Sequence, residues 1–436
     1  MVNSLQFASM LEKETNTLAK VARPDFPALT QLNKEGKPLI YLDHAATSQK
    51  PYQVLQVLDH YYKYDNANVH RGAHQLSSRA TEAFESAREI TAQFIGAKRA
   101  SEIVFTRNAT EAINLIARCW GDSTIKEGDE ILLTVMEHHS NLIPWQLLAA
   151  RTNCILRHIG ITEDGELDIE DLKAKLNERT KLVSLVHISN TLGCINPVSL
   201  VSQMAHAVGA LVLIDACQSL AHLPINVNDL GADILVGSSH KLCGPTGIGF
   251  LWACEHFLEK LPPFLGGGEM IQDVFLNYSS WAKLPYKFEA GTPSIGEAIG
   301  MGAAISYLQY IGLDRIQRWE HILTEQLFEG LNKIEGIKIL GPNLRQQGKR
   351  AALASFVLED LHANDLAAFL DTSGICIRSG HHCTQPLHRY YGITASARAS
   401  LSFTTTPEEI NCFIEELKET IKFFRKHNVR SASSKY

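Results

Sequence analysis

The sequence lacks the features that mark secreted, zinc-binding and membrane proteins. Its nine cysteines are scattered over 436 residues and never form a C-x-x-C pair, which disfavours a disulfide framework or a metal site and suits a reducing cytoplasm. The N-terminal stretch has no continuous apolar segment, and no later window reaches the roughly 20 apolar residues of a membrane span. We therefore predict a cytoplasmic protein without a membrane anchor.

An excess of positive charge is also missing. The formal net charge is -6, so the chain has no basic footprint for a nucleic-acid backbone, and we expect a small-molecule substrate. Hydrophobic residues make up 45% of the chain and charged residues 20%, which is ordinary for a globular protein with room for two domains.

Short apolar runs lie between residues 130 and 252, and most are separated by stretches long enough for a helix. Strands that are apolar on both faces are typical of a parallel sheet buried between helices, so an α/β domain is predicted. The runs are EILLTVM, KLVSLVHIS, ALVLIDA, DILVGSS and GIGFLWA.

Two other segments have the periodicity of surface helices. From Leu76 the apolar residues recur at intervals of three and four until Gly96. Near the C-terminus, Thr406 and Glu409 form a capping box, with Pro407 at the first helical position. Both segments are therefore predicted as helices with one buried face.

Polar side chains follow several of the apolar runs. The ligand crevice of an open parallel sheet lies at the carboxyl ends of its strands, so we expect these side chains to converge on one site. They are His138, Asn190, Asp215, Gln218, Ser238, His240 and Lys241.

Lys241 lies between an apolar strand and a glycine-rich turn in SSHKLCGPTG. A desolvated lysine can form a Schiff base, although a lysine that opens a surface loop is more common. Such a lysine usually serves pyridoxal 5′-phosphate, which also needs a carboxylate, a flat ring partner and an anion site. Asp215 can supply the carboxylate and His138 the flat ring partner. Thr110, at a predicted helix start, can supply the anion site.

Ten ordered motifs between about residues 38 and 416 resemble those of group II (SufS-type) cysteine desulfurases. These are fold-type I pyridoxal-phosphate enzymes of the class V aminotransferase superfamily. The motifs are YLDHAATSQKP, NVHRGAHQLS, ATEAINL, MEHHSNLIPWQ, SNTLGCINP, IDACQS, SSHKLCGPTGIGFL, GTPSIGEAIG, RSGHHCTQP and ARASLSFTTT. The resemblance implies a mainly parallel seven-stranded sheet between helices in a large domain, and a smaller α+β C-terminal domain.

The chain is accordingly divided into four predicted parts. Residues 1–36 form an N-terminal arm that packs on the small domain, and residues 37–296 form the large pyridoxal-phosphate-binding domain. Residues 297–425 form the small domain with the cysteine loop, and residues 426–436 form a polar tail.

The resemblance also implies a role for each candidate site residue. Lys241 would carry the Schiff base, Asp215 would meet the pyridinium nitrogen, and His138 would stack on the ring. Further cofactor contacts would come from Gln218, Asn190, Thr110, Ser238, His240 and, across a homodimer, Thr292. Substrate contacts would come from Arg398, Arg378 and Asn190. One departure is NATE where many relatives have GTTE, so that Ala109 lacks a hydroxyl.

Cys383 lies in IRSGHHCTQP, outside any apolar periodic segment, which argues against a buried structural cysteine. A zinc site with His381 and His382 lacks a second ligand pair, and a redox thiol lacks a C-x-x-C partner. A mobile nucleophile remains, and Arg378 and the two histidines could favour its thiolate.

The predicted reaction converts L-cysteine to L-alanine and leaves the sulfur as a persulfide on Cys383. Resemblance implies that a SufE-type or SufU-type acceptor protein then takes the sulfur for iron-sulfur cluster assembly. Selenocysteine lyase, or another class V pyridoxal-phosphate lyase or aminotransferase, is the alternative. A non-enzymatic scaffold would leave the convergence of polar strand ends unexplained.

Overall fold

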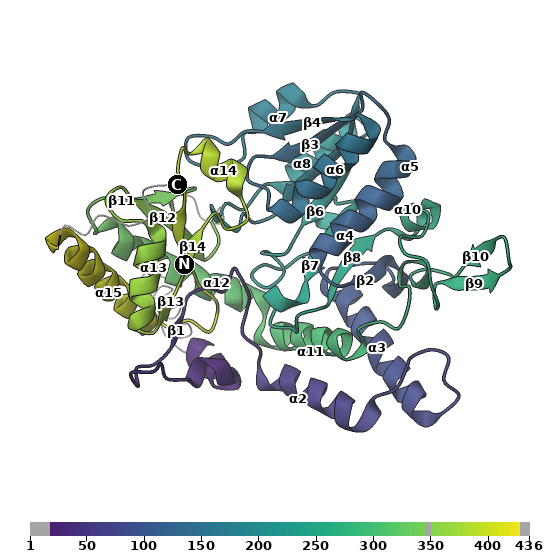
Figure 1. The fold of residues 1–436 in the computed structure, drawn as a ribbon, viewed down its shortest axis with the longest axis horizontal. Helices are drawn as coiled ribbons and strands as arrows, with labels where there is room; N and C mark the ends of the chain where they lie inside the picture. The colour runs from purple at the N-terminus through teal and green to yellow at the C-terminus, as the bar shows by residue number, and fades with distance from the viewer. Residues whose placement is uncertain (1–17, 345–349, 428–436) are drawn as a thin grey trace, which may run out of the picture.

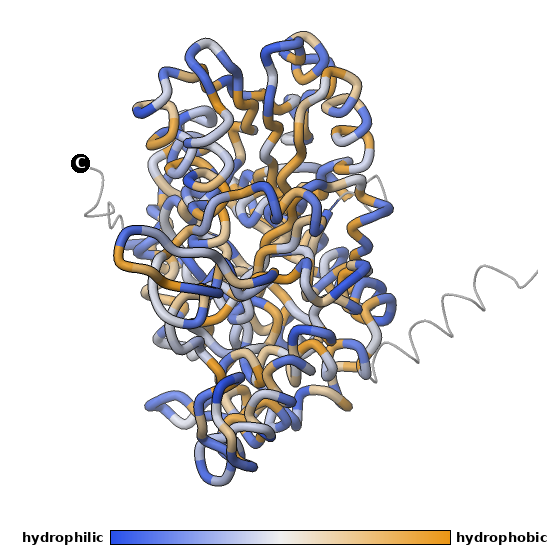
Figure 2. The backbone as a smooth tube through the Cα atoms, turned by 90° about the vertical axis from the view of Figure 1, so that its right-hand side faces the viewer, coloured by the Kyte–Doolittle hydropathy of each residue, from blue (hydrophilic) through white to orange (hydrophobic). Residues whose placement is uncertain are grey.

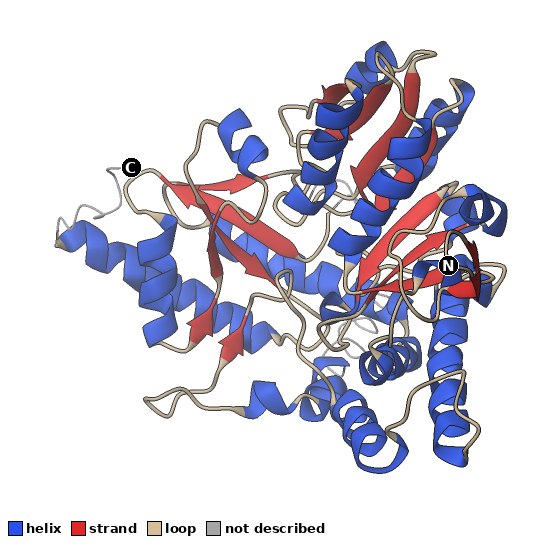
Figure 3. Cartoon of the chain, turned by 45° about the vertical axis from the view of Figure 1, so that its right-hand side comes forward, coloured by secondary structure: helices blue, strands red, loops and turns tan. Residues whose placement is uncertain are grey.

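The computed structural model of the protein, which describes residues 18–344 and 350–427, contains two main sheets, seen apart in Figure 1 and Figure 3. The strands of the large sheet are β2 (Ile103–Thr106), β3 (Glu130–Thr134), β4 (Ile155–Ile159), β5 (Thr180–Val186), β6 (Leu211–Asp215), β7 (Ile234–Ser238) and β8 (Gly249–Ala253). Their order in space is β2-β8-β7-β6-β5-β3-β4. Neighbouring strands are parallel except at β8, which runs antiparallel to β7 and β2.

The large sheet lies between two helical layers. Alternate residues of β3 belong to different cores, with Leu132 in one and Ile131 and Leu133 in the other. The first core is covered by α3 (Gln75–Phe94), α8 (Val198–Ala207) and α11 (Ile295–Ile311), and the second by α4 (Ala109–Ile116), α6 (Ile143–Thr152) and α10 (Glu255–Lys260). This explains why the strands are apolar on both faces and confirms the predicted α/β fold. In Figure 2 the hydrophobic segments run mainly through the interior.

The small sheet is antiparallel and has the order β11-β12-β15-β14. Its strands are β11 (Ile337–Leu340), β12 (Leu353–Leu358), β14 (Arg378–Gly380) and β15 (Ser396–Ser400). The helices of this region are α12 (Leu313–Asn332), α13 (Ala363–Thr372), α14 (Gln385–Tyr390) and α15 (Pro407–Lys426). The predicted capping box starts α15, and α3 ends two residues before Gly96, so both helix predictions are confirmed.

The segment before the large sheet packs against the C-terminal region. Arg23 forms an ion pair with Glu409 at 2.8 Å, and Phe26 contacts Phe403 edge to face. The short strand β1 (Ile40–Tyr41) pairs in parallel with β13 (Ile375–Cys376). The chain therefore crosses from the C-terminal region to the large sheet after β1, and the four-part domain division stays a prediction.

The other elements lie on the outside of these layers. They are α2 (Tyr52–His60), α5 (Asp122–Thr124), α7 (Ile169–Lys175), α9 (Val227–Leu230), β9 (Ile271–Val274) and β10 (Ser279–Trp281). The hairpin β9–β10 projects from the body of the molecule (Figure 1). Among the described residues, no helix combines the length and the apolar character needed to cross a membrane.

Candidate active site

A cavity of about 660 Å³ lies where the strands of the large sheet end, and the small sheet closes its other side. Its lining includes every residue predicted for the site except Thr292: Thr110, His138, Asn190, Asp215, Gln218, Ser238, His240, Lys241, Arg378, Cys383 and Arg398. Thr292 is exposed and does not line this cavity.

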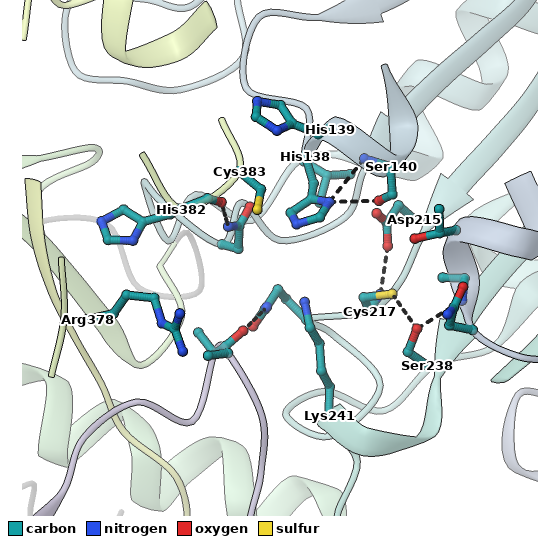
Figure 4. Close-up of a pocket in the computed structure, with 18 of the residues that line it drawn as sticks. His138, His139, Ser140, Asp215, Cys217, Ser238, Lys241, Arg378, His382 and Cys383 are labelled. Carbon is teal, nitrogen blue, oxygen red and sulfur yellow. Dashed lines mark hydrogen bonds between the residues drawn. The ribbon is translucent and has the colours of Figure 1, made fainter. Parts of the chain in front are cut away.

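One wall of the cavity, here called the sheet wall, consists of the groups at the ends of β3, β5, β6 and β7. Asp215 is the last residue of β6, and Lys241 ends the short turn that follows β7. His138 lies four residues after the end of β3. Because β3, β6 and β7 point in the same direction, their ends bring these side chains to one edge of the sheet (Figure 4).

His138 presents a neutral, flat ring to the cavity. Burial, followed by the positive charge of Lys241, lowers its pKa to about 4. Its Nδ1 accepts a hydrogen bond from the Ser140 backbone N–H at 3.1 Å, so the ring proton lies on Nε2. A neutral ring in a fixed orientation is suited to stacking on a planar ligand.

Asp215 is buried, and its Oδ1 accepts a hydrogen bond from the Cys217 backbone N–H at 3.0 Å. The thiol of Cys217 also lines the cavity, 3.7 Å from the hydroxyl of Ser238. Burial raises the pKa of the Cys217 thiol and keeps it protonated. Cys217 was not predicted as a site residue, although it lies in the motif IDACQS.

The start of α4 also faces the cavity. Asn108, not Thr110, caps this helix, because its side chain accepts from the Glu111 backbone N–H at 3.0 Å. The hydroxyl of Ser238 accepts a hydrogen bond from the Ala109 N–H at 2.9 Å and ties the helix to the end of β7. Free N–H groups and hydroxyls at a helix start favour an anion such as phosphate.

The opposite wall, here called the loop wall, consists of residues 378–385 and Arg398. Arg378 on β14 and Arg398 on β15 lie directly opposite each other in the sheet. Asp43 accepts hydrogen bonds from both, at 2.8 Å from Arg378 Nη2 and 3.1 Å from Arg398 Nη2. Asp43 was not predicted, although it lies in the motif YLDHAATSQKP.

The cysteine loop has an unusual backbone. His382 and Cys383 both adopt left-handed conformations, with φ of 49° and 56°. Hydrogen bonds from the sheet wall hold the loop there, because Asn190 Nδ2 donates to the His382 carbonyl at 2.7 Å and the His139 N–H donates to the Cys383 carbonyl at 2.8 Å. Such strain persists only where surrounding contacts over-determine it. Cys383 itself is exposed.

His382 does not supply a positive charge to the thiol. Its ring is buried and points away from Cys383 (Figure 4), with Nε2 at 3.0 Å from the Ser396 hydroxyl. Burial, followed by the charge of Arg398, lowers its pKa to about 2. The expectation that both histidines favour the thiolate is therefore wrong for His382, which acts as an anchor of the loop.

Three buried polar atoms of the cavity-lining residues have no partner among the described residues, one of them Nδ1 of His382. The other two are Oδ1 of Asn190, which is an acceptor, and Nε of Arg398, which is a donor. Leaving both unpaired is costly, so the site fits a ligand that carries a hydroxyl or N–H group and an anionic group. Within the described residues, no cluster of His, Cys, Asp or Glu is arranged to hold a metal ion.

The chain matches the aminotransferase class-V family over residues 40–413. The chain belongs to this family. A probable cysteine desulfurase of Synechocystis is 55% identical over 415 residues, which are 95% of this chain and 98% of that protein. The family match and this relative agree with the resemblance seen in the motifs.

Solved structures of cysteine desulfurases share the fold of this family member. The enzyme of Thermococcus onnurineus superposes with a TM-score of 0.87 and 42% identity, covering 93% of this chain and 98% of that chain. CsdA of Escherichia coli superposes with a TM-score of 0.85 and 31% identity, with the same coverage of 93% and 98%.

Proposed function

We propose that the protein is a pyridoxal-phosphate-dependent cysteine desulfurase of the group II (SufS) type. The observation that carries this proposal is that Lys241 and Cys383 line one cavity from opposite walls (Figure 4). A Schiff-base lysine alone suits many reactions of amino acids, whereas a thiol on the facing wall suits the removal of sulfur. The identity to proteins named probable cysteine desulfurases supports the same activity.

Pyridoxal phosphate, when bound, supplies an electron sink for bonds broken at the substrate's Cα. Lys241 would bind its carbonyl carbon, Asp215 its ring nitrogen and His138 its ring face. The unpartnered Oδ1 of Asn190 would accept from the ring hydroxyl, next to Gln218. Its phosphate would be held by Thr110, Ser238, His240 and, from a second subunit, Thr292.

Arg398 would orient the substrate. Its guanidinium is buried and held by Asp43 and by the Asn190 carbonyl at 2.9 Å, with Nε still free to donate. A fixed guanidinium fork binds a carboxylate in one orientation. Once the amine of the substrate has taken the place of Lys241, the released Lys241 amine would remove the proton from Cα as a general base.

Cys383 then takes the sulfur. Its thiolate attacks the substrate sulfur, so that a new S–S bond forms while the Cβ–S bond breaks. The electron pair of the broken bond stays on the carbon skeleton, which takes up a proton and leaves as L-alanine. One L-cysteine and one thiol thus give one L-alanine and one persulfide, without an external oxidant.

The test is substitution of the nucleophile. Cys383→Ala should keep the visible absorbance of the cofactor and lose alanine production from L-cysteine by at least about a hundredfold. Cys254→Ala, which removes an exposed thiol outside the cavity, should behave as wild type. Full turnover by Cys383→Ala with a protein acceptor would overturn the assignment. Turnover of L-selenocysteine is measured with wild type and with Cys383→Ala. A selenocysteine lyase should release selenium at a similar rate with and without Cys383, whereas a cysteine desulfurase should lose its activity on L-cysteine in Cys383→Ala.

A homodimer is part of the proposal. Thr292 can hold phosphate only in a second copy, because it does not line the cavity of its own chain. The hairpin β9–β10 exposes Phe275, Leu276 and Trp281, and such apolar surface is typical of an interface. Sedimentation of the holoenzyme should give twice the chain mass, and a monomer with full activity would contradict the dimer.

The proposed destination of the sulfur is an acceptor protein of the SufE or SufU type in the cytoplasm. Exposure of Cys383 on a short loop, anchored by Asn190 and His139, supports delivery to a partner that approaches the cavity. Alanine production should rise when such an acceptor is added, and the acceptor should carry the sulfur. Iron-sulfur cluster assembly would then use the delivered sulfur.

A further inference from the structure

A second cavity, of about 390 Å³, shares no lining residue with the active-site cavity. Its lining comes from residues that follow β5 and β6, from helix α12 and from the segment before β12. Ile188 and Ile195, which pair in an isolated bridge, line it, whereas Asn190 between them lines the active-site cavity. One short segment thus separates the two cavities, and the volume of the second is typical of a small-molecule site.

Arg350 brings a buried positive charge to this cavity. Its side chain is only 7% exposed, and its guanidinium donates to backbone carbonyls, among them that of Leu340 at 2.9 Å from Nη2. Nε of Arg350 has no hydrogen-bond partner in residues 18–344 and 350–427. Burial lowers the pKa of this guanidinium to about 9, because no carboxylate compensates its charge. A buried N–H of a charged group without an acceptor is costly, so the site lacks an anion.

The other charged groups of the lining do not supply that anion. Arg318 on α12 is exposed, and none of the ion pairs found within the described part of the chain involves it or Arg350. Glu320 is already paired, since His222 Nδ1 lies 2.8 Å from its Oε2. Burial would lower the pKa of His222, but the Glu320 carboxylate outweighs it and raises the pKa, so this pair adds no net charge. The lining therefore carries two uncompensated guanidiniums.

Most of the uncharged lining residues are apolar. Apolar surface is stabilised when a ligand removes it from water. Inorganic phosphate would satisfy the two arginines and leave the apolar side chains against water, so the lining suits an anion that also has an apolar body. The apolar residues are Ile188, Ile195, Leu223, Ala351 and Ala352.

We propose that this second cavity binds a small carboxylate with an apolar body, held by Arg350 and Arg318. Nε of Arg350 would donate to the carboxylate from inside, and Arg318 would add its charge at the exposed edge. The site is separate from the active site, so this inference does not depend on the proposed function.

The first test compares hexanoate, acetate and 1-hexanol by calorimetry on the holoenzyme. Acetate lacks the apolar chain and hexanol lacks the charge. Hexanoate should bind with a dissociation constant of about 1 mM or tighter, at least about tenfold more tightly than either of the others. Hexanoate binding that is absent, or no tighter than that of acetate or hexanol, would overturn the proposal.

The second test places the binding in this cavity. Arg318→Gln removes an exposed charge and should weaken hexanoate binding about threefold. The matched control is Arg315→Gln, three residues earlier on α12 and outside the cavity, where Arg315 donates to the Ile311 carbonyl. It should bind hexanoate as wild type does, and equal weakening in both variants would mean that the general charge of the helix attracts the ligand, against the proposal.

Arg350→Lys keeps the positive charge but removes the Nε–H, and it should weaken hexanoate binding by at least about tenfold. Arg398→Lys, in the active-site cavity, should leave this binding unchanged. If Arg350→Lys does not fold, Arg318→Gln and Arg398→Lys still decide the question. Loss of binding in Arg398→Lys together with wild-type binding in Arg318→Gln would place hexanoate in the active site and overturn the proposal.

Discussion

The two walls of the cavity are held in place in different ways. In the sheet wall, Asp215 ends one strand and Lys241 follows another, and the residues of both strands are almost all buried, so the core of the sheet sets their positions. In the loop wall, Cys383 lies on left-handed backbone that depends on hydrogen bonds from Asn190 and His139. The comparison teaches that the reactive thiol is positioned by the wall it faces.

The strongest test of this comparison is Lys241→Ala in the sheet wall. Loss of the amine should abolish the visible absorbance of the lysine-bound cofactor and all measurable alanine production. Lys181→Ala, at the opposite end of β5, should keep both, because Lys181 lies outside the cavity and its amine contacts the Glu178 carbonyl and the Asp129 carboxylate. A normal spectrum in Lys241→Ala would show that another group binds the cofactor.

Ser396→Ala tests the support of the loop wall. Its hydroxyl lies 3.0 Å from Nε2 of both His382 and His388, so its loss leaves two buried ring nitrogens without this partner. We expect a loss of about 2 kcal/mol in the free energy of unfolding, measured in urea, and slower persulfide formation with an unchanged cofactor spectrum. The control Ser123→Ala removes an exposed hydroxyl and should cost little. An equal loss of unfolding free energy in Ser396→Ala and Ser123→Ala would show that the Ser396 hydroxyl does not support the loop wall.

Acid should weaken the sheet wall through its buried histidines. Burial lowers the pKa of His187, directly after β5, to about 4, whereas the unfolded chain binds this proton near pH 6.5. The unfolded state thus holds more protons between these values, so stability falls as pH decreases from about 6.5 to 4, by up to ~1.4 kcal/mol per unit. His187→Gln should flatten the pH dependence of urea unfolding in this range, and an unchanged slope would refute the assignment.

The smallest expected effect concerns the contact between the walls. The hydroxyls of Thr191 and Thr384 lie 2.9 Å apart and are buried. Thr191→Val keeps the shape and removes this hydrogen bond, which should cost about 1 kcal/mol in thermal unfolding. The control Thr372→Val lies at an exposed helix end. If Thr191→Val and Thr372→Val lose the same thermal stability, the hydrogen bond between Thr191 and Thr384 does not stabilise the contact between the walls.

Much of the sheet wall could be predicted because its signals are local. An apolar run followed by a polar residue marks a strand end, and parallel strands bring such ends together, as for Asp215 and Lys241. The antiparallel direction of β8 could not be predicted, since pairing is decided by contacts distant in sequence. Asp43 was missed because its arginine partners lie 335 and 355 residues away.

The left-handed cysteine loop was also beyond local prediction. Residues other than glycine seldom adopt positive φ, and two in a row, as at His382 and Cys383, are not indicated by the residue types alone. Only the contacts from Asn190 and His139 reveal why the backbone stays there.

The pairing of β1 with β13 has a consequence for synthesis of the chain. The pairing of Ile40 with Ile375 can form only after Ile375 has been synthesised, and the ion pair of Asp43 with Arg398 only after Arg398 has been synthesised. Before these residues have been made, all strands of the large sheet are already present in the chain, but the carboxylate of Asp43 has no arginine to bind. The loop wall can therefore be completed only after Arg398 has been synthesised, later than every strand of the sheet wall.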